Sequence, residues 1–275
     1  MAQACEPDNW RFGRITPKRG PATRAADTIV NFQPYEIVGA DRPSHYLFVC
    51  DHAANTVPPF VNGGDLGLSP EDMARHIAWD VGAAGVTRRL AERLDAPAIL
   101  SNFSRLVIDP NRGEDDPTLV MKLYDGSVIP ANRHADAAEV ERRLDLCYRP
   151  YHAALERLIL AREAPVIISI HSFTPRLIGR PPRPWHVGVL YSHDAQLARP
   201  LIARLRREPD LCVGDNEPYS GHLTGDTMDR HGVQPNRCHA LIELRNDLIA
   251  DTAAQHAWAD RLAPILDDAL AAAAL

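Results

Sequence analysis

The stretch Leu47-Phe-Val-Cys-Asp-His-Ala-Ala-Asn-Thr-Val-Pro58 decides the fold, because an apolar run breaks abruptly into Asp51-His52 and a small-residue turn closed by Pro58. A short apolar run bounded by a turn predicts a buried strand. In an open α/β sheet, ligands bind beyond the carboxyl ends of the strands. The histidine that follows this strand is therefore a candidate for chemistry.

Two later stretches repeat the pattern. Pro165–Pro175 ends an apolar run on His171, and Cys238–Asp247 carries Glu243 and Arg245. Parallel strands would bring these polar ends to one edge of a sheet. Strand ends that supply two histidines and a glutamate point to a metal hydrolase.

Composition limits the class of protein. The 275 residues are 45% hydrophobic, enough for one large core, and we expect a loosely ordered arm over residues 1–35 and a single catalytic domain over residues 36–275. A net charge of −6 argues against nucleic-acid or membrane partners and favours a small-molecule substrate. Five scattered cysteines and the lack of an apolar stretch of about 18 residues predict a cytoplasmic protein. The oligomeric state is left open.

Strands and helices alternate along the rest of the chain. Ser69, Pro70 and the following acids predict the start of a helix that runs to about Leu94. The further predicted elements are a strand at Pro97–Asn102, a loop at Gly113–Pro130, a helix to about Arg162 that Pro150 kinks, a strand at Trp185–Tyr191, a helix from about Asp194, a polar loop at Gly214–His222 and a helix from about Thr252. The pattern predicts an α/β domain with a central, mostly parallel mixed sheet and helices on both faces.

A catalytic zinc ion needs about three protein ligands and one open position. His52 and His171 are the best candidates, although either alone could be a hydrogen-bonded core histidine. The third ligand is less clear, since Asn55 has a neutral amide that binds zinc poorly. Asp80, or His76 one helical turn earlier, is an alternative, and both could instead lie on a solvated helix face. Asp51 would point away from its neighbour His52 along an extended backbone.

Glu243 is the natural general base, because a carboxylate near activated water can take its proton and pass it to a leaving nitrogen. Its alternative is a structural ion pair with Arg245. Arg105 could stabilise an oxyanion or be an ordinary surface arginine.

Asn111 and Arg112 are placed to grip a substrate carboxylate, unless Asp109 or Asp116 holds Arg112 in a structural pair. A serine hydrolase is disfavoured, because neither Ser172 nor Ser220 lies in a G-x-S-x-G motif.

Six motifs, in this order, resemble those of a known family. They are Asp51-His-Ala-Ala-Asn55 with Pro58, His76-Ile-Ala-Trp-Asp80-Val-Gly82, Ser104-Arg-Leu-Val-Ile-Asp-Pro-Asn-Arg112, Ile170-His-Ser-Phe-Thr-Pro175, Asn216-Glu-Pro-Tyr-Ser-Gly221 and Ile242-Glu-Leu-Arg-Asn-Asp247. Over about Phe48 to Leu248 the chain resembles the N-formylglutamate amidohydrolases, whose fold is similar to that of the zinc carboxypeptidases.

The resemblance implies hydrolysis of an N-acyl amino acid, in the type case N-formyl-L-glutamate to L-glutamate and formate. It implies one zinc ion per chain held by His52 and His171, and Asn55 departs from the glutamate ligand of carboxypeptidases, so we favour Asp80 as the third ligand. The same resemblance implies the following roles: Glu243 as base, Arg105 at the oxyanion, and Asn111 with Arg112 at the α-carboxylate.

A second substrate carboxylate would need further donors. The candidates are Arg133, Arg176, Arg245 and, from the loop at Asn216–Gly221, Asn216, Tyr219 and Ser220. Two alternatives stay open. The site could act on another N-acyl amino acid, or the protein could be a metal-poor module that binds acidic metabolites without turnover.

Overall fold

The computed structural model describes residues 32–274. Its main sheet contains seven strands, and a two-stranded hairpin lies apart from it. The strands of the main sheet are β1 (Tyr35–Val38), β2 (Tyr46–Cys50), β3 (Ala98–Ser101), β6 (Val166–Phe173), β7 (Val187–Leu190), β8 (Val213–Asp215) and β9 (His239–Arg245). The predicted N-terminal arm lies outside the described residues except for residues 32–35, and Tyr35 already belongs to β1.

The main sheet is mixed but mostly parallel, in the order β1-β3-β2-β6-β9-β7-β8. β1 pairs with β3 and β7 pairs with β9 in antiparallel fashion, while the other neighbouring strands are parallel. Every residue of β2 and β6 is buried, as expected for strands that are covered on both faces. The predicted α/β fold with a mostly parallel sheet is confirmed.

Helices cover the two faces of the sheet. On one face, α3 (Ala83–Arg93), α6 (Ala198–Leu205) and α7 (Thr252–Ala273) bury their apolar sides against alternate strand residues such as Phe48 and Ile168. On the other face, α5 (Arg149–Leu160) packs on the intervening strand residues. No helix in the described part of the chain is both long and apolar enough to cross a membrane.

The predicted long helix from Pro70 to Leu94 is wrong in its middle. The structure has α2 (Pro70–Ala74), capped by Ser69 as predicted, and then the separate α3. Arg75 adopts an extended conformation with φ −78° and ψ 163°, which ends α2. Gly82, with φ 84°, turns the chain into α3. The intervening segment is thereby free to lie across the end of the sheet.

The predicted helix that ends near Arg162 consists of four pieces. They are η2 (Pro130–Asn132), α4 (Ala137–Arg143), the π-helical turn η3 (Leu144–Tyr148) and α5. Pro150 lies in the first turn of α5, where its missing N–H is tolerated, so the predicted break at this proline is confirmed.

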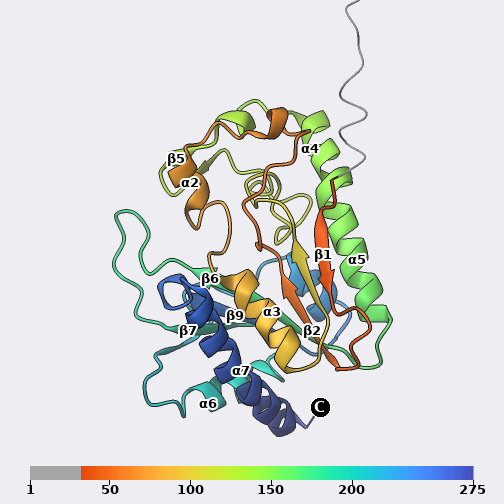
Figure 1. Cartoon of the computed structure of the whole chain (residues 1–275), viewed down its shortest axis with the longest axis vertical. Coiled ribbons are helices and arrows are strands. Elements are labelled where there is room, and N and C mark those ends of the chain that lie inside the picture. The colour runs from red at the N-terminus through yellow and green to blue at the C-terminus, as the bar shows by residue number, and fades with distance from the viewer. Residues whose placement is uncertain (1–31, 275) are drawn as a thin grey trace, which may run out of the picture.

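The predicted loop at Gly113–Pro130 contains the hairpin of β4 (Leu123–Tyr124) and β5 (Ser127–Val128). Two-residue strands leave almost no periodic signal, which explains why the sequence pattern missed them. The hairpin, α2 and α4 gather at one end of the molecule, away from α6 and α7 (Figure 1). These segments have a hydrophobic core of their own that includes Leu66, Ile77 and Phe103.

Candidate active site

Three adjacent parallel strands bring the predicted site residues together. His52 follows the end of β2, His171 lies in β6 and Glu243 lies in β9. β6 and β9 run side by side with His171 directly opposite Glu243. All three side chains line one pocket, as do Asp80 and Arg105.

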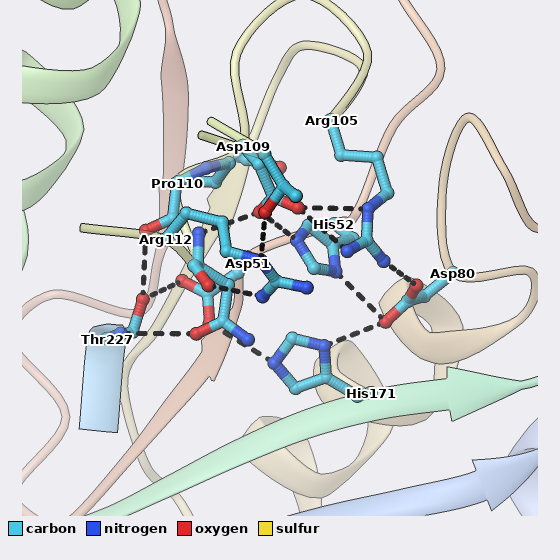
Figure 2. Close-up of polar contacts among 12 residues, drawn as sticks. Asp51, His52, Asp80, Arg105, Asp109, Pro110, Arg112, His171 and Thr227 are labelled. Atoms are coloured by element: carbon cyan, nitrogen blue, oxygen red, sulfur yellow. Dashed lines mark hydrogen bonds and ion pairs between the residues drawn. The ribbon is translucent and has the colours of Figure 1, made fainter. Parts of the chain in front are cut away.

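His52, Asp80 and His171 form a buried cluster in which one ligand atom from each lies within 4.8 Å of the others. The Nδ1 atom of His52 is 3.3 Å from Asp80 Oδ2, and the Nδ1 atom of His171 is 2.8 Å from the same oxygen. Two imidazoles therefore converge on one carboxylate through equivalent nitrogens. Figure 2 shows Asp80 between the two rings.

The broken helix explains how Asp80 reaches this position. The backbone N–H of Asp80 donates to the carbonyl of His52 over 2.9 Å. The N–H of Ser172 donates to Asp80 Oδ2 over 3.2 Å, and the Ser172 hydroxyl donates to the carbonyl of Val81 over 2.8 Å. Asp80 is thus tied by its backbone to the end of β2 and by its side chain to β6.

The outer nitrogen of each histidine meets another buried carboxylate. Nε2 of His52 is 2.7 Å from Asp109 Oδ1, and Nε2 of His171 is 3.2 Å from Asp51 Oδ2. Such carboxylates fix the tautomer and the orientation of histidines that bind metal through the other nitrogen. The sequence gave no role of this kind to Asp51 or Asp109, because contacts between distant segments leave no local pattern.

The chemistry of these side chains fits a divalent metal ion. Burial alone would raise the pKa of Asp80, but the charge of His52 and the hydrogen bond of His171 outweigh burial and hold this pKa below its usual range. The ionised carboxylate and two oriented imidazoles form the donor set that zinc prefers. His76 and Asn55 lie differently: His76 Nε2 is 3.4 Å from Asp125, and the Asn55 amide donates to the Met73 carbonyl.

Glu243 lies beside this cluster with one oxygen unused. Its side chain is buried, and its Oε2 has no hydrogen-bond partner among the described residues. Burial raises the pKa of Glu243 to about 7. A carboxylate with such a pKa exchanges protons readily near neutral pH. The alternative of an ion pair with Arg245 does not apply, because Arg245 pairs with Asp247 at 2.8 Å.

Arg105 lies in the pocket wall rather than on the surface. Its Nη2 donates to Asp109 Oδ2 over 2.7 Å, and its Nη1 is 3.6 Å from Asp80 Oδ1. Its guanidinium carbon is 5.5 Å from the centre of the Tyr124 ring. Burial would lower the pKa of Arg105, but Asp109 outweighs burial and raises it, so Arg105 stays charged.

Asn111 and Arg112 line the same pocket. Asn111 Oδ1 accepts from the backbone N–H of Thr227 over 3.1 Å. Arg112 donates to the Asn111 carbonyl and to the Thr118 hydroxyl, and it has no acidic partner within 4 Å in the described part of the chain. The predicted alternative pairing of Arg112 with Asp109 or Asp116 is therefore absent from residues 32–274.

The segment that carries Arg105 and Arg112 is irregular, and buried side chains hold it. Arg143 donates to the carbonyl of Val107, and Asn132 donates to the carbonyl of Leu106, each over 2.7 Å. These bonds replace the ladder that a strand would provide.

The residues predicted for a second carboxylate divide into two groups. Tyr219 and Ser220 line the pocket, whereas Arg133, Arg176, Asn216 and Arg245 do not. Arg176 donates to the Arg180 carbonyl. Asn216 supports the loop instead, because its Oδ1 accepts from the backbone N–H groups of Tyr191 and Gly221. We report these four positions as a correction: they extend from loops or a strand end that turn away from the pocket.

The pocket also contains residues that the sequence did not single out for the site. They are Tyr124, Phe173, Leu190, Leu223, Asp226 and Leu241. Most are apolar or lie in loops, where a single sequence offers no signal to separate a pocket wall from core.

Known proteins share this sequence and architecture. The family model for N-formylglutamate amidohydrolase matches residues 44–250. The solved structure of gene product Atu2144 from Agrobacterium tumefaciens is 34% identical with a TM-score of 0.83, and the match covers 88% of this chain and 96% of that one. N-formylglutamate amidohydrolase from Ralstonia eutropha JMP134 is 23% identical with a TM-score of 0.56, covering 87% and 97%.

A metallo-carboxypeptidase from Burkholderia cenocepacia matches at 13% identity with a TM-score of 0.40, covering 91% of this chain and 67% of that one. None of the curated proteins matches the sequence. The family match spans well over half of the chain and includes every residue of the buried cluster and its neighbouring glutamate. The chain therefore belongs to the N-formylglutamate amidohydrolase family and is a hydrolase that acts on amide bonds.

Proposed function

We propose that the protein is a zinc-dependent hydrolase that removes the acyl group of an N-acyl amino acid, with N-formyl-L-glutamate as the reference substrate. One observation carries the proposal. The unpartnered Oε2 of Glu243 lies in the same pocket as the His52, Asp80 and His171 cluster and the free guanidinium of Arg112. A base, a metal-binding set and a carboxylate anchor are the parts that this hydrolysis requires.

His52, Asp80 and His171 would hold the metal ion. When bound, such an ion acts as a Lewis acid that polarises a carbonyl oxygen and lowers the pKa of water. Glu243 takes a proton from the attacking water and delivers it to the departing amide nitrogen, for which its pKa of about 7 is suited.

Two arginines have different tasks in this proposal. Arg105, held on Asp109, stabilises negative charge that develops on the acyl oxygen. Asn111 and Arg112 bind the α-carboxylate and so orient the amide. The pocket has a volume of about 140 Å³, which suits one amino acid with a small acyl group such as formyl.

The test is an assay of the purified protein, loaded with zinc, on N-formyl-L-glutamate and on other N-formyl and N-acetyl amino acids. We expect hydrolysis that a chelator abolishes and zinc restores. The variant Glu243→Gln should keep its zinc and lose activity by about 10²-fold or more, because it removes the base without changing the size of the side chain.

Near-normal turnover of a zinc-loaded Glu243→Gln would rule out Glu243 as the base. Stoichiometric zinc without hydrolysis of any N-acyl amino acid would contradict the proposed reaction. Failure of the wild-type protein to bind zinc would favour the metal-poor binding module instead.

A further inference from the structure

One end of the pocket has no task in the reaction as proposed. The metal cluster with Glu243 occupies one part of the lining, and Asn111 with Arg112 occupies another. The rest of the lining consists mainly of apolar and small residues together with one acid: Phe173, Leu190, Tyr219, Ser220, Gly221, Leu223, Asp226 and Leu241. A substrate held by its α-carboxylate and its amide has only its side chain left to place there.

Asp226 is the one carboxylate in this part of the lining. It is 5% exposed, and its Oδ1 accepts from the backbone N–H of Asp229 over 2.7 Å. No side-chain or backbone donor reaches its second oxygen, and no basic group lies within 4 Å of it, in the part of the chain that the structure describes. A nearly buried carboxylate thus presents an unsatisfied oxygen to the pocket.

Capping alone does not explain this aspartate. The bond to Asp229 is the N-cap interaction of the helical turn that follows, and asparagine or serine caps as well as aspartate does. A neutral cap would avoid the cost of burying a charge. The negative charge therefore has a use beyond the cap, and the pocket is the place where a ligand could meet it.

The positive charges of the lining are on the other side of the reaction centre. Arg105 is paired with Asp109, and Arg112 is committed to the α-carboxylate. Arg133 and Arg176, which the sequence offered for a second carboxylate, are not in the lining. A glutamate side chain would bring its carboxylate toward Asp226 without a cation of its own.

We propose that Asp226 makes this pocket select N-acyl amino acids whose side chain ends in a nitrogen hydrogen-bond donor over those whose side chain ends in a carboxylate. The inference rests on the proposed function and names its substrate class. The three leucines contact the aliphatic stem, and the amine or amide at its tip donates to the free oxygen of Asp226. A charge-assisted hydrogen bond of this kind is favourable, while two buried carboxylates repel.

The protonation of Asp226 agrees with this assignment. Burial raises the pKa of Asp226 to about 7, and the nearby Asp51 and Asp229 add to the effect, while the bond from Asp229 N–H and the charge of His171 oppose it. A cationic side chain would stabilise the ionised form, so binding a substrate would draw a proton from Asp226 near neutral pH.

The experiment compares kcat/KM for N-formyl derivatives of L-lysine, L-glutamine, L-norleucine and L-glutamate at pH 8. We expect the wild type to prefer lysine and glutamine to glutamate by about 10-fold or more. The variant Asp226→Asn keeps the size and the cap, and should lower the lysine-to-glutamate ratio by about 10-fold or more. Asp267→Asn, at an exposed position of α7, is the control and should leave the ratio unchanged.

A wild type that prefers glutamate, or a ratio that Asp226→Asn does not move, would overturn the inference. If no derivative is hydrolysed, the proposed function fails, and calorimetry of the four free amino acids with the wild type and Asp226→Asn then decides. Tighter binding of lysine than of glutamate that depends on Asp226 would support the pocket assignment. Equal binding would overturn it.

Discussion

Asp51 Oδ2 lies 3.2 Å from His171 Nε2, on the side of the imidazole ring opposite Asp80. Asp51 is completely buried, and Tyr151, Ser169 and Thr227 donate their hydroxyl groups to it. Figure 2 shows the contact between Asp51 and the ring. Its acceptance of four donors fixes the carboxylate, and the fixed carboxylate in turn holds Nδ1 of His171 toward Asp80.

This contact predicts a loss of metal affinity when Asp51 becomes Asn. The neutral amide orients the ring less firmly and leaves the imidazole a weaker ligand, so we expect zinc to bind about 10- to 100-fold more weakly. Competition with a chromophoric chelator measures the affinity, and circular dichroism checks the fold. Ser169→Ala removes the longest contact to Asp51, at 3.3 Å, and should change the affinity much less. Equal affinities of Asp51→Asn and the wild type would contradict the assigned role.

The third ligand is tested by comparing Asp80→Ala with Asn55→Ala. Asp80 faces both histidines, whereas Asn55 bonds to the backbone of Met73. We expect Asp80→Ala to lose bound zinc after dialysis and Asn55→Ala to retain it, as measured by elemental analysis. If Asp80→Ala held as much zinc as the wild type while His52→Ala held none, Asp80 would not be a ligand.

Gly82 predicts a stability effect that a second glycine controls. Its φ is +84°, and an added Cβ would lie 2.3 Å from the carbonyl oxygen of Ile249. We expect Gly82→Ala to lower the free energy of unfolding by about 3 kcal/mol or more. Gly63 has φ +72° but nothing within 4 Å of its added Cβ, so Gly63→Ala should cost only about 1 kcal/mol. Urea denaturation compares the two, and equal losses would show that the contact with Ile249 is unimportant.

The pKa of Asp226 predicts a stability difference that depends on pH. In the unfolded chain its pKa is near 3.8, whereas burial raises the folded-state pKa to about 7. The folded state therefore binds the proton more tightly, and the wild type loses stability as pH rises from about 4 to 7. Asp226→Asn lacks this titration. It should match the wild type below pH 4 and be more stable by a few kcal/mol, roughly, above pH 7. Thermal melts at both ends of the range measure the difference, and a constant offset would refute the titration.

Much of the fold follows from local patterns. The buried strands around His52, His171 and Glu243 have the apolar runs that predict them, and the structure places them side by side. The cap at Ser69 and the break at Pro150 were likewise readable, because each depends on one or two neighbouring residues. The helix expected to reach Leu94 failed, since its apolar spacing continues through a segment that tertiary contacts hold in a different conformation.

The site was less predictable than the strands. Asp51 was expected to point away from the chemistry, and it does point away from His52, but toward a histidine 120 residues later in the chain. Arg133 and Arg176 were chosen for their charge alone, and the structure puts them outside the pocket. Asp226 resembles any polar loop residue until the fold surrounds it with the leucines of β7 and β9.

The pairing of His171 with Glu243 across β6 and β9 has a consequence for how this family can diversify. The separation of these two side chains is set by backbone hydrogen bonds between adjacent strands, whereas Tyr219, Ser220 and Asp226 belong to the connection between β8 and β9. Recognition and chemistry are therefore carried by separate modules. Exchange of residues 216–226 between relatives would alter the choice of amino acid while leaving the reaction centre in register, which makes this loop the natural target for redesign.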